Sequence, residues 1–338
     1  MDLTTLRKNA REKLTGFCRV CPVCDGRVCA GEVPGMGGTG TGSSFKTNVE
    51  ALAKRRFNMR TIHDVKTVDT SLSLWGTKLA VPVLAAPMTG TPYNMGGKIS
   101  EIDFVTAIIA GALQAGTLGM TGDGADPSMW ASGLQAVSAN GGKGIAFIKP
   151  RDQKEIMTRI RDAEKAGALA VGIDIDGAGL ITMALKGQPV SPKTFAELKE
   201  VISSTKLPFI LKGIMTPDEA ELAVKAGAAA IVVSNHGGRV LDFTPGAADV
   251  LPKIVERVKG KAIIFADGGV RSGADVLKLL ALGADAVLVG RPLVVGAFGG
   301  GAEGVALLLK KMKDELVSAM LLTNTASVTK VDRAILVQ

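Results

Sequence analysis

The sequence predicts an α/β protein built as a closed (β/α)₈ barrel, preceded by a short Cys-rich N-terminal extension. Three observations predict this fold: eight short apolar runs recur along the chain, helix-period stretches alternate with them, and glycines stand at the junctions. The 338 residues, 46% of them apolar, suffice for one such TIM barrel. A doubly wound sheet is the alternative, because periodicity alone does not prove that the sheet closes.

Each strand is expected where an apolar run has strand length, since parallel strands buried on both faces are continuously apolar. These runs lie at 82–87, 117–122, 144–150, 169–176, 208–214, 230–235, 262–269 and 286–292. Helices are expected between them, for example over 152–167 and 217–227. At four junctions a helix ends, a glycine takes the left-handed position and a strand follows, which is typical of βα repeats: Gly116, Gly167, Gly227 and Gly283.

Composition narrows the class of protein. Forty Lys and Arg against 32 Asp and Glu give a net charge of +8, which suits anionic ligands. The basic residues are scattered without interleaved aromatics, so no nucleic-acid partner is expected. The chain has no run of 18 apolar residues and a polar start, so we expect no membrane span, no secretory signal and a cytoplasmic location. A homo-oligomer is also expected.

We divide the chain into a Cys-rich head (1–30) with a Gly-rich linker (31–44), and a barrel over 45–338. The head is expected to lie outside the barrel repeats. Its four cysteines are spaced C-x₂-C-x₂-C-x₄-C: Cys18, Cys21, Cys24 and Cys29. They could converge on zinc or an iron–sulfur cluster, and free thiols are the alternative. Gly35, Gly37 and Gly40 spell GxGxxG, but no strand precedes them, so we do not interpret them as a dinucleotide motif.

Chemistry in such a barrel lies where the strands end, at the carboxyl face. Charged and titratable side chains follow the predicted strands there and place a base and several cations around one mouth: Lys149, Asp174, Asp176, Lys212, His236, Arg239, Asp267, Arg271 and Arg291.

Two stretches carry a resemblance to a known family. Residues 207–242, with SNHGGRVLD at 234–242, and residues 265–292, with ADGGVR, resemble the FMN-dependent α-hydroxy-acid oxidase and dehydrogenase family. That family includes glycolate oxidase and lactate oxidase. The resemblance is dense over 205–330, fainter over 45–200 and absent over 1–44.

The resemblance implies roles for four catalytic residues. His236 would be the base that takes a proton from the substrate. Arg239 would clamp the substrate carboxylate with its planar fork. Asp174 would orient the histidine, with Asp176 as the alternative, and Lys212 would lie beside flavin N1 and O2.

The resemblance also implies an FMN site. Asp267 would accept hydrogen bonds from the ribityl hydroxyls. The phosphate would be bound by the loops after the seventh and eighth predicted strands, through Gly268, Gly269, Arg271, Gly290 and Arg291. The other cofactor contacts would come from the first and sixth strands: Ala86, Pro87, Met88, Thr89, Ser234 and Gly237.

The implied function is oxidation of a small anionic 2-hydroxy acid, by proton abstraction and hydride transfer to flavin N5. The electron acceptor stays open. One alternative is a non-redox flavin barrel like type 2 isopentenyl-diphosphate isomerase, whose APMTG element also occurs within 85–90. Another is an electron-transfer protein that couples FMN to a metal or iron–sulfur head.

Two departures from the family concern the substrate. Its two active-site tyrosines are missing, since no tyrosine precedes Tyr93 and the third strand has Ala146 and Phe147 instead. Tyr93 is a candidate substitute. The stretch between Asp174 and Lys212 is also short, so we expect a reduced lid formed only by a loop.

Overall fold

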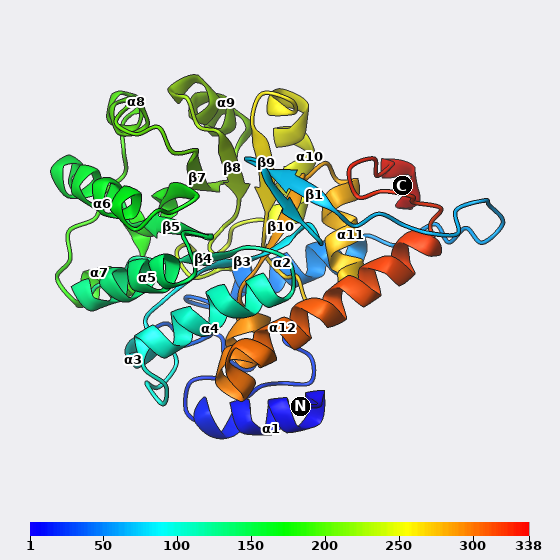
Figure 1. Ribbon diagram of the computed structural model, residues 1–338, viewed down its shortest axis with the longest axis horizontal. Helices are drawn as coiled ribbons and strands as arrows, with labels where there is room; N and C mark the ends of the chain where they lie inside the picture. The colour runs from blue at the N-terminus through cyan, green and yellow to red at the C-terminus, as the bar shows by residue number, and fades with distance from the viewer. Residues whose placement is uncertain (338) are drawn as a thin grey trace.

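The computed structural model describes residues 1–337, and its centre is a closed barrel of eight parallel strands (Figure 1). In order around the barrel they are β3 (Val83–Met88), β4 (Gly119–Thr121), β5 (Gly144–Ile148), β6 (Ala170–Asp174), β7 (Phe209–Ile214), β8 (Ala230–Val233), β9 (Ile263–Ala266) and β10 (Ala286–Val289). Because β10 pairs with β3, with Val287 opposite Val83, the sheet closes. The predicted TIM barrel is confirmed, and the doubly wound alternative is wrong.

The strands are linked by helices that surround the barrel. These are α4 (Glu101–Gln114), α5 (Pro127–Ala139), α6 (Gln153–Lys165), α8 (Phe195–Ser203), α9 (Pro217–Ala226), α10 (Ala247–Val258), α11 (Gly273–Ala281) and α12 (Arg291–Leu321). The predicted helices over 152–167 and 217–227 are confirmed as α6 and α9, which the side chains of Asp152 and Thr216 cap. All four junction glycines have positive φ, as predicted.

The apolar core has two layers because successive strand side chains point to opposite faces. Phe147, Ile210 and Phe265 fill the barrel interior, whereas Ala146, Ile148 and Leu211 pack outward against the helices. A hairpin that the sequence analysis did not predict, β1 (Leu72–Leu74) and β2 (Thr77–Leu79), packs on the interior layer before β3 begins. It plugs the end where the strands start.

The chain's first and last long helices pack together. α1 (Leu3–Lys13) lies along α12 (Figure 1), and Gly299 allows this contact, since a Cβ there would lie 2.3 Å from the Leu6 carbonyl oxygen. By length and composition α12 could cross a membrane, contrary to our expectation from the absence of an 18-residue apolar run. Half of its most apolar stretch is buried, however, and its backbone leaves the helical conformation at Gly300 and Gly301. This is the environment of a core helix.

The head adds no strand to the barrel, yet it does not stand apart from it. Arg271, on the loop after β9, donates to the carbonyl oxygen of Cys24 in the head, and Arg291, the first residue of α12, donates to those of Met36 and Gly37 in the linker. α2 (Ser43–Lys54) follows the linker and packs against α10. The head, which the sequence analysis placed outside the barrel repeats, therefore packs against the barrel.

Candidate active site

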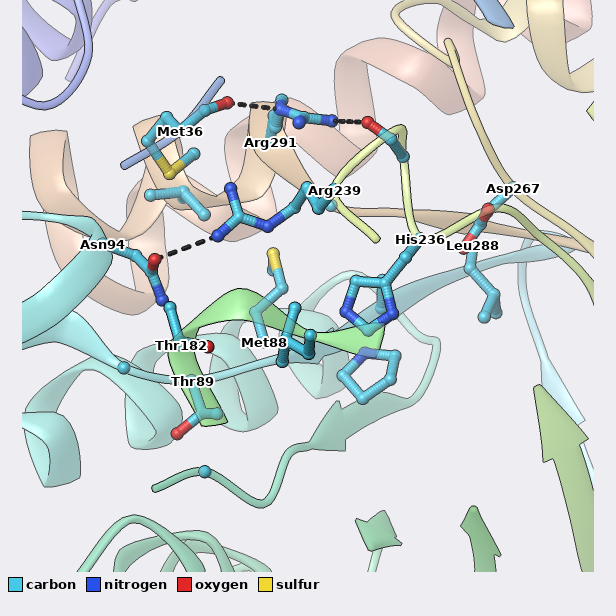
Figure 2. Close-up of a pocket in the computed structure, with 18 of the residues that line it drawn as sticks. Met36, Met88, Thr89, Asn94, Thr182, His236, Arg239, Asp267, Leu288 and Arg291 are labelled. Carbon is cyan, nitrogen blue, oxygen red and sulfur yellow. Dashed lines mark hydrogen bonds between the residues drawn. The ribbon is translucent and has the colours of Figure 1, made fainter. Parts of the chain in front are cut away.

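One cavity opens at the carboxyl ends of the strands, where the site was predicted. Figure 2 shows His236, Arg239 and Arg291 around it, with Asn94 and Met36 of other segments opposite. Two of the predicted catalytic and cofactor residues, Asp174 and Ser234, lie behind the cavity wall. All the others line the cavity: Ala86, Pro87, Met88, Thr89, Lys212, His236, Gly237, Arg239, Asp267, Gly268, Gly269, Arg271, Gly290 and Arg291.

The turn after β8 aims the histidine into this cavity. His236, Gly237 and Gly238 have φ values of 58°, 64° and 78°, a left-handed run that disfavours a histidine. The buried Ser234 hydroxyl holds the turn by accepting the His236 backbone N–H at 3.0 Å. Position 237 needs glycine, because a Cβ there would lie 2.6 Å from Arg291 Nη1. Ser234 thus positions the turn and does not face the cavity.

The carboxylate bonded to the histidine is Asp176, whose Oδ1 lies 3.0 Å from His236 Nδ1. Since an ionised carboxylate can only accept, Nδ1 carries the proton, and Nε2 keeps the lone pair that a general base needs. The assignment of this role to Asp174 is wrong in the structure. Gly213 (φ 100°) makes room for the actual partner, because a Cβ there would lie 2.7 Å from Asp176 Cβ.

Asp174 instead lies between two lysines. Lys149 Nζ is 2.7 Å from its Oδ2 and Lys212 Nζ is 2.9 Å from its Oδ1, and all three side chains are buried. Burial alone would raise the pKa of Asp174, but the two ammonium groups hold it well below its usual range. The carboxylate that the family resemblance assigned to the histidine therefore neutralises lysines. The sequence analysis named Lys149 on the rim without a role.

The pH dependence follows from the surroundings of His236. Burial lowers the pKa of His236 below its ordinary 6.5, and Lys212 lowers it further, while Asp176 and Asp174 oppose both. A lowered pKa keeps the base neutral to lower pH. The rate of flavin reduction should therefore be level at neutral pH and fall only below about pH 6.5.

Stopped-flow measurement of flavin reduction across pH tests this expectation. Asp176→Asn should shift the fall in the rate to still lower pH, because it removes a charge that raises the pKa of His236. Burial also raises the pKa of Asp267 to about 6, so the profile needs repeating in Asp267→Asn. A midpoint above 6.5 in both proteins would contradict the prediction.

Arg239, the predicted carboxylate clamp, holds neutral partners in this structure. Its Nη1 donates to the Gly35 carbonyl oxygen at 2.5 Å, and its Nη2 donates to Asn94 Oδ1 at 2.9 Å (Figure 2). Burial lowers the pKa of Arg239 to about 10. The linker therefore crosses the mouth of the barrel, and the role of Gly35 is to present a carbonyl oxygen to this arginine.

The two predicted phosphate arginines lie near the Phe45 ring, at 3.8 Å (Arg291) and 5.6 Å (Arg271) from its centroid. Arg291 donates to the carbonyl oxygens of Met36 (2.7 Å), Gly37 (2.8 Å) and Gly237 (3.0 Å). Burial, together with Arg239 and Arg271, lowers the pKa of Arg291 to about 9. Three close guanidinium groups with mainly neutral partners make this wall suited to an anion.

These surroundings fit FMN. Arg271 Nη2 and Asp267 Oδ1 are buried without hydrogen-bond partners, so one unpaired donor and one unpaired acceptor face a phosphate-and-hydroxyl ligand. Gly268 and Gly269 (φ 91° and 79°) lie beside them, although their Cβ atoms would collide with Asn48 of α2, so packing also requires these glycines. Residues 86–89, at the carboxyl end of β3 and just after it, also line the cavity.

The departures from the family are visible in the cavity wall. Ala146 and Phe147 are fully buried and do not line the cavity, whereas Tyr93, on α3 (Thr91–Asn94), does. The Lys186 ammonium lies 4.6 Å from the centre of the Tyr93 ring. The reduced lid is also more ordered than a loop, since it contains the 3₁₀ helix η1 (Ile175–Gly179) and α7 (Ile181–Leu185).

Three residues near the cavity were missed. Asp123 binds Arg151 through Nε at 2.8 Å, and both are buried. Glu101 accepts the hydroxyl of Thr89 at 2.5 Å, so that predicted cofactor residue already has a partner. Asn94 follows no strand, so its contact with Arg239 left no signal in the strand-end pattern.

Potential metal ligands converge at one place in residues 1–337. There, donor atoms of Asp174, Asp176 and His236 lie within 4.8 Å of one another. The ammonium groups of Lys149 and Lys212 already pair with Asp174 and disfavour a further cation there, so we do not interpret this group as a metal site. The four cysteines are unbridged and half-buried.

Comparison with known proteins decides the family. Residues 35–184 and 181–338 match the model of the FMN-dependent dehydrogenases. The chain belongs to the FMN-dependent dehydrogenase family. The resemblance inferred from SNHGGRVLD is thereby confirmed, and this FMN-dependent dehydrogenase has its Cys-rich head outside the matched residues.

Relatives and solved structures agree with this assignment. This dehydrogenase is 30% identical to glycolate oxidase 1 of Zea mays over 330 residues, which cover 86% of each chain. It is 32% identical to a 2-hydroxyacid oxidase of Dictyostelium discoideum, over 86% of its own length and 81% of that protein. The structure of mandelate oxidase with benzoyl-formic acid superposes with a TM-score of 0.79 at 30% identity, covering 99% of this chain and 97% of that one.

Proposed function

We propose that this FMN-dependent dehydrogenase oxidises a 2-hydroxy acid. The observation that carries the proposal is one cavity that holds both a histidine with a free Nε2 and an arginine fork, His236 and Arg239. A base and a carboxylate clamp are what removal of hydrogen from a carbon next to a carboxylate requires. The names of the relatives, glycolate oxidase and 2-hydroxyacid oxidase, support the same substrate class.

Each side chain has a distinct task. Bound FMN supplies the two-electron acceptor of the reaction. His236 Nε2 takes the substrate proton, and Asp176 stabilises the imidazolium that forms. Arg239 exchanges the Gly35 carbonyl for the substrate carboxylate, which its planar fork can bind with two hydrogen bonds. Lys212, with a pKa that Asp174 and Asp176 raise despite burial, keeps a permanent positive charge beneath the cavity.

We further propose a substrate bulkier than glycolate. The cavity wall is rich in apolar side chains, which suit a large apolar substituent, and the methionines among them are flexible: Met36, Met88, Met95, Ala125, Met129, Leu180 and Val294. The absence of the two phenols removes groups that would hold a small polar acid. The structural relative mandelate oxidase is seen with benzoyl-formic acid, an aromatic acid.

The test is anaerobic reduction of the purified flavoprotein by a panel of glycolate, lactate and aromatic 2-hydroxy acids. FMN, and not FAD, should be released on denaturation, and an aromatic acid should reduce it fastest. Arg239→Lys should raise the acid concentration for half-maximal reduction about tenfold or more, because an ammonium replaces a bidentate fork. Arg55→Lys, at a surface pair with Asp249, is the matched control.

Two outcomes would redirect the assignment. Reduction by NADH but by no hydroxy acid would contradict the substrate class. Turnover of a diphosphate substrate without net redox change would favour the isomerase-like alternative. The expected homo-oligomer and cytoplasmic location stay predictions.

A further inference from the structure

A second cavity lies behind the phosphate arginines and is lined by all four cysteines of the head. Its volume is about 380 Å³, far larger than the voids of a packed interior, few of which exceed one water molecule. The cavity shares Met36, Arg271 and Arg291 with the active-site cavity. Because the family match begins at residue 35, the family pattern does not account for Cys18 to Cys29.

The backbone of the cysteine loop is held in place by α1. Arg7 donates to the carbonyl oxygens of Val20 (3.1 Å) and Cys21 (2.6 Å), and Arg11 donates to that of Val20 (3.2 Å). Val20 takes the left-handed conformation, φ 47°, and its N–H donates to Cys18 Sγ at 3.4 Å. Hydrogen bonds to cysteine sulfur are among the groups that tune iron–sulfur clusters.

The distance between the cysteine sulfurs distinguishes a site for one metal ion from a site for a cluster. Zinc–sulfur bonds of about 2.3 Å would place tetrahedral thiolates about 3.8 Å apart. Within residues 1–337, no three of the cysteine sulfurs approach within 4.8 Å of one another. Thiols spread around a cavity suit a polynuclear core, whose thiolates bind different iron atoms and therefore stay farther apart.

The charges around the cavity select an anionic occupant. Five cationic side chains and one carboxylate, that of Asp25, line it: Arg7, Arg19, Arg271, Arg291 and Lys311. Arg19 and Lys311 pair with Glu32 and Glu315, so the excess positive charge comes from Arg7, Arg271 and Arg291, which bond carbonyl oxygens. Four thiolates outweigh the positive charge of an iron–sulfide core, so the ligated cluster is net negative. Arg271, whose buried Nη2 has no hydrogen-bond partner, lines both cavities.

We propose that Cys18, Cys21, Cys24 and Cys29 ligate an iron–sulfur cluster of the [4Fe–4S] class, next to the phosphate end of the FMN site. Arg291 and Arg271 separate the two cofactor sites. Such a cluster carries electrons singly, so the head would add a one-electron centre to a flavoenzyme barrel. This assignment is independent of which hydroxy acid the barrel oxidises.

Metal analysis of the anaerobically purified full-length protein tests the proposal. We expect about four iron and four acid-labile sulfide per chain, and an electron paramagnetic resonance signal after dithionite reduction. Cys21→Ala with Cys24→Ala should lose iron, sulfide and signal but keep FMN, because Arg271 bonds the Cys24 carbonyl, which the substitution retains. Val23→Ala, at an exposed side chain of the same loop, is the matched control and should change none of these.

Three results would overturn the proposal. One equivalent of zinc without sulfide would indicate a single-ion site. Less than about half an equivalent of iron after reconstitution with iron and sulfide, with four titratable thiols, would indicate free cysteines. Full iron content in the double variant would place the iron elsewhere. Should that variant not fold by circular dichroism, the wild-type analysis and Cys29→Ser decide the question.

Discussion

Flavin reduction by a 2-hydroxy acid should slow by at least about 100-fold when His236 is replaced by alanine, which is the usual cost of losing general-base catalysis. The substitution removes Nε2, the nitrogen that Asp176 keeps free at the cavity wall. Alanine keeps the backbone N–H that donates to Ser234 Oγ at 3.0 Å, so the turn should persist. Stopped-flow reduction under argon measures the effect.

The matched control is the chain's other histidine. His63 Nε2 contacts the Leu321 carbonyl oxygen at 2.9 Å and does not line the active-site cavity, so His63→Ala should leave the rate of reduction unchanged. FMN content should stay normal in both variants. Reduction of His236→Ala at the wild-type rate would remove His236 from the mechanism.

The largest effect on stability is expected from Asp174→Asn. The substitution keeps the shape of the side chain but removes the carboxylate that pairs directly with the buried ammonium groups of Lys149 and Lys212. Breaking a buried pair in this way typically costs about 3–5 kcal/mol, so the melting temperature should fall by many degrees. Denaturant unfolding of the FMN-bound protein gives the free energy directly.

A second substitution makes this result specific. Lys149→Met on the Asp174→Asn background removes one of the unpaired charges and should restore part of the lost free energy of unfolding. Asp314→Asn, which breaks an exposed pair with Lys310, should cost less than about 1 kcal/mol. Equal losses for Asp174→Asn and Asp314→Asn would contradict the buried-pair argument.

The barrel was predictable because its strands are buried on both faces, so each one appears as a continuous apolar run, and four of the runs follow a glycine junction. Pairs such as Val287 with Val83 then follow from closure. The plug over 72–79 was not predicted, because its strands are only three residues long and give no periodic signal. Strands this short are stabilised by tertiary packing, here on the residues inside the barrel, and not by a local sequence pattern.

The choice between Asp174 and Asp176 illustrates the limit at the site. In a continuous strand, residues two apart lie on the same face, so the pattern could not separate these two carboxylates. The strand in fact ends at Asp174, and a 3₁₀ helix carries Asp176 to the histidine. The place where β6 stops decides the assignment, and strand boundaries are the least predictable feature of a sequence.

The position of the head was hidden for a different reason. Arg239, Arg271 and Arg291 reach it mainly through backbone carbonyl oxygens. Every residue has such an oxygen, so these contacts impose no side-chain pattern on the linker. Glycines at 35 and 37 were the available signal, since they let the main chain pass close to another group.

The contact between α1 and α12 also sets an order of events during synthesis. The N-terminal helix leaves the ribosome first, but its packing partner, residues 291–321, is among the last segments made. Until then the linker lacks Arg291, which donates to the carbonyl oxygens of Met36 and Gly37 across the mouth of the barrel. The linker can therefore take its full set of contacts across the mouth of the barrel only after the start of α12 has been made.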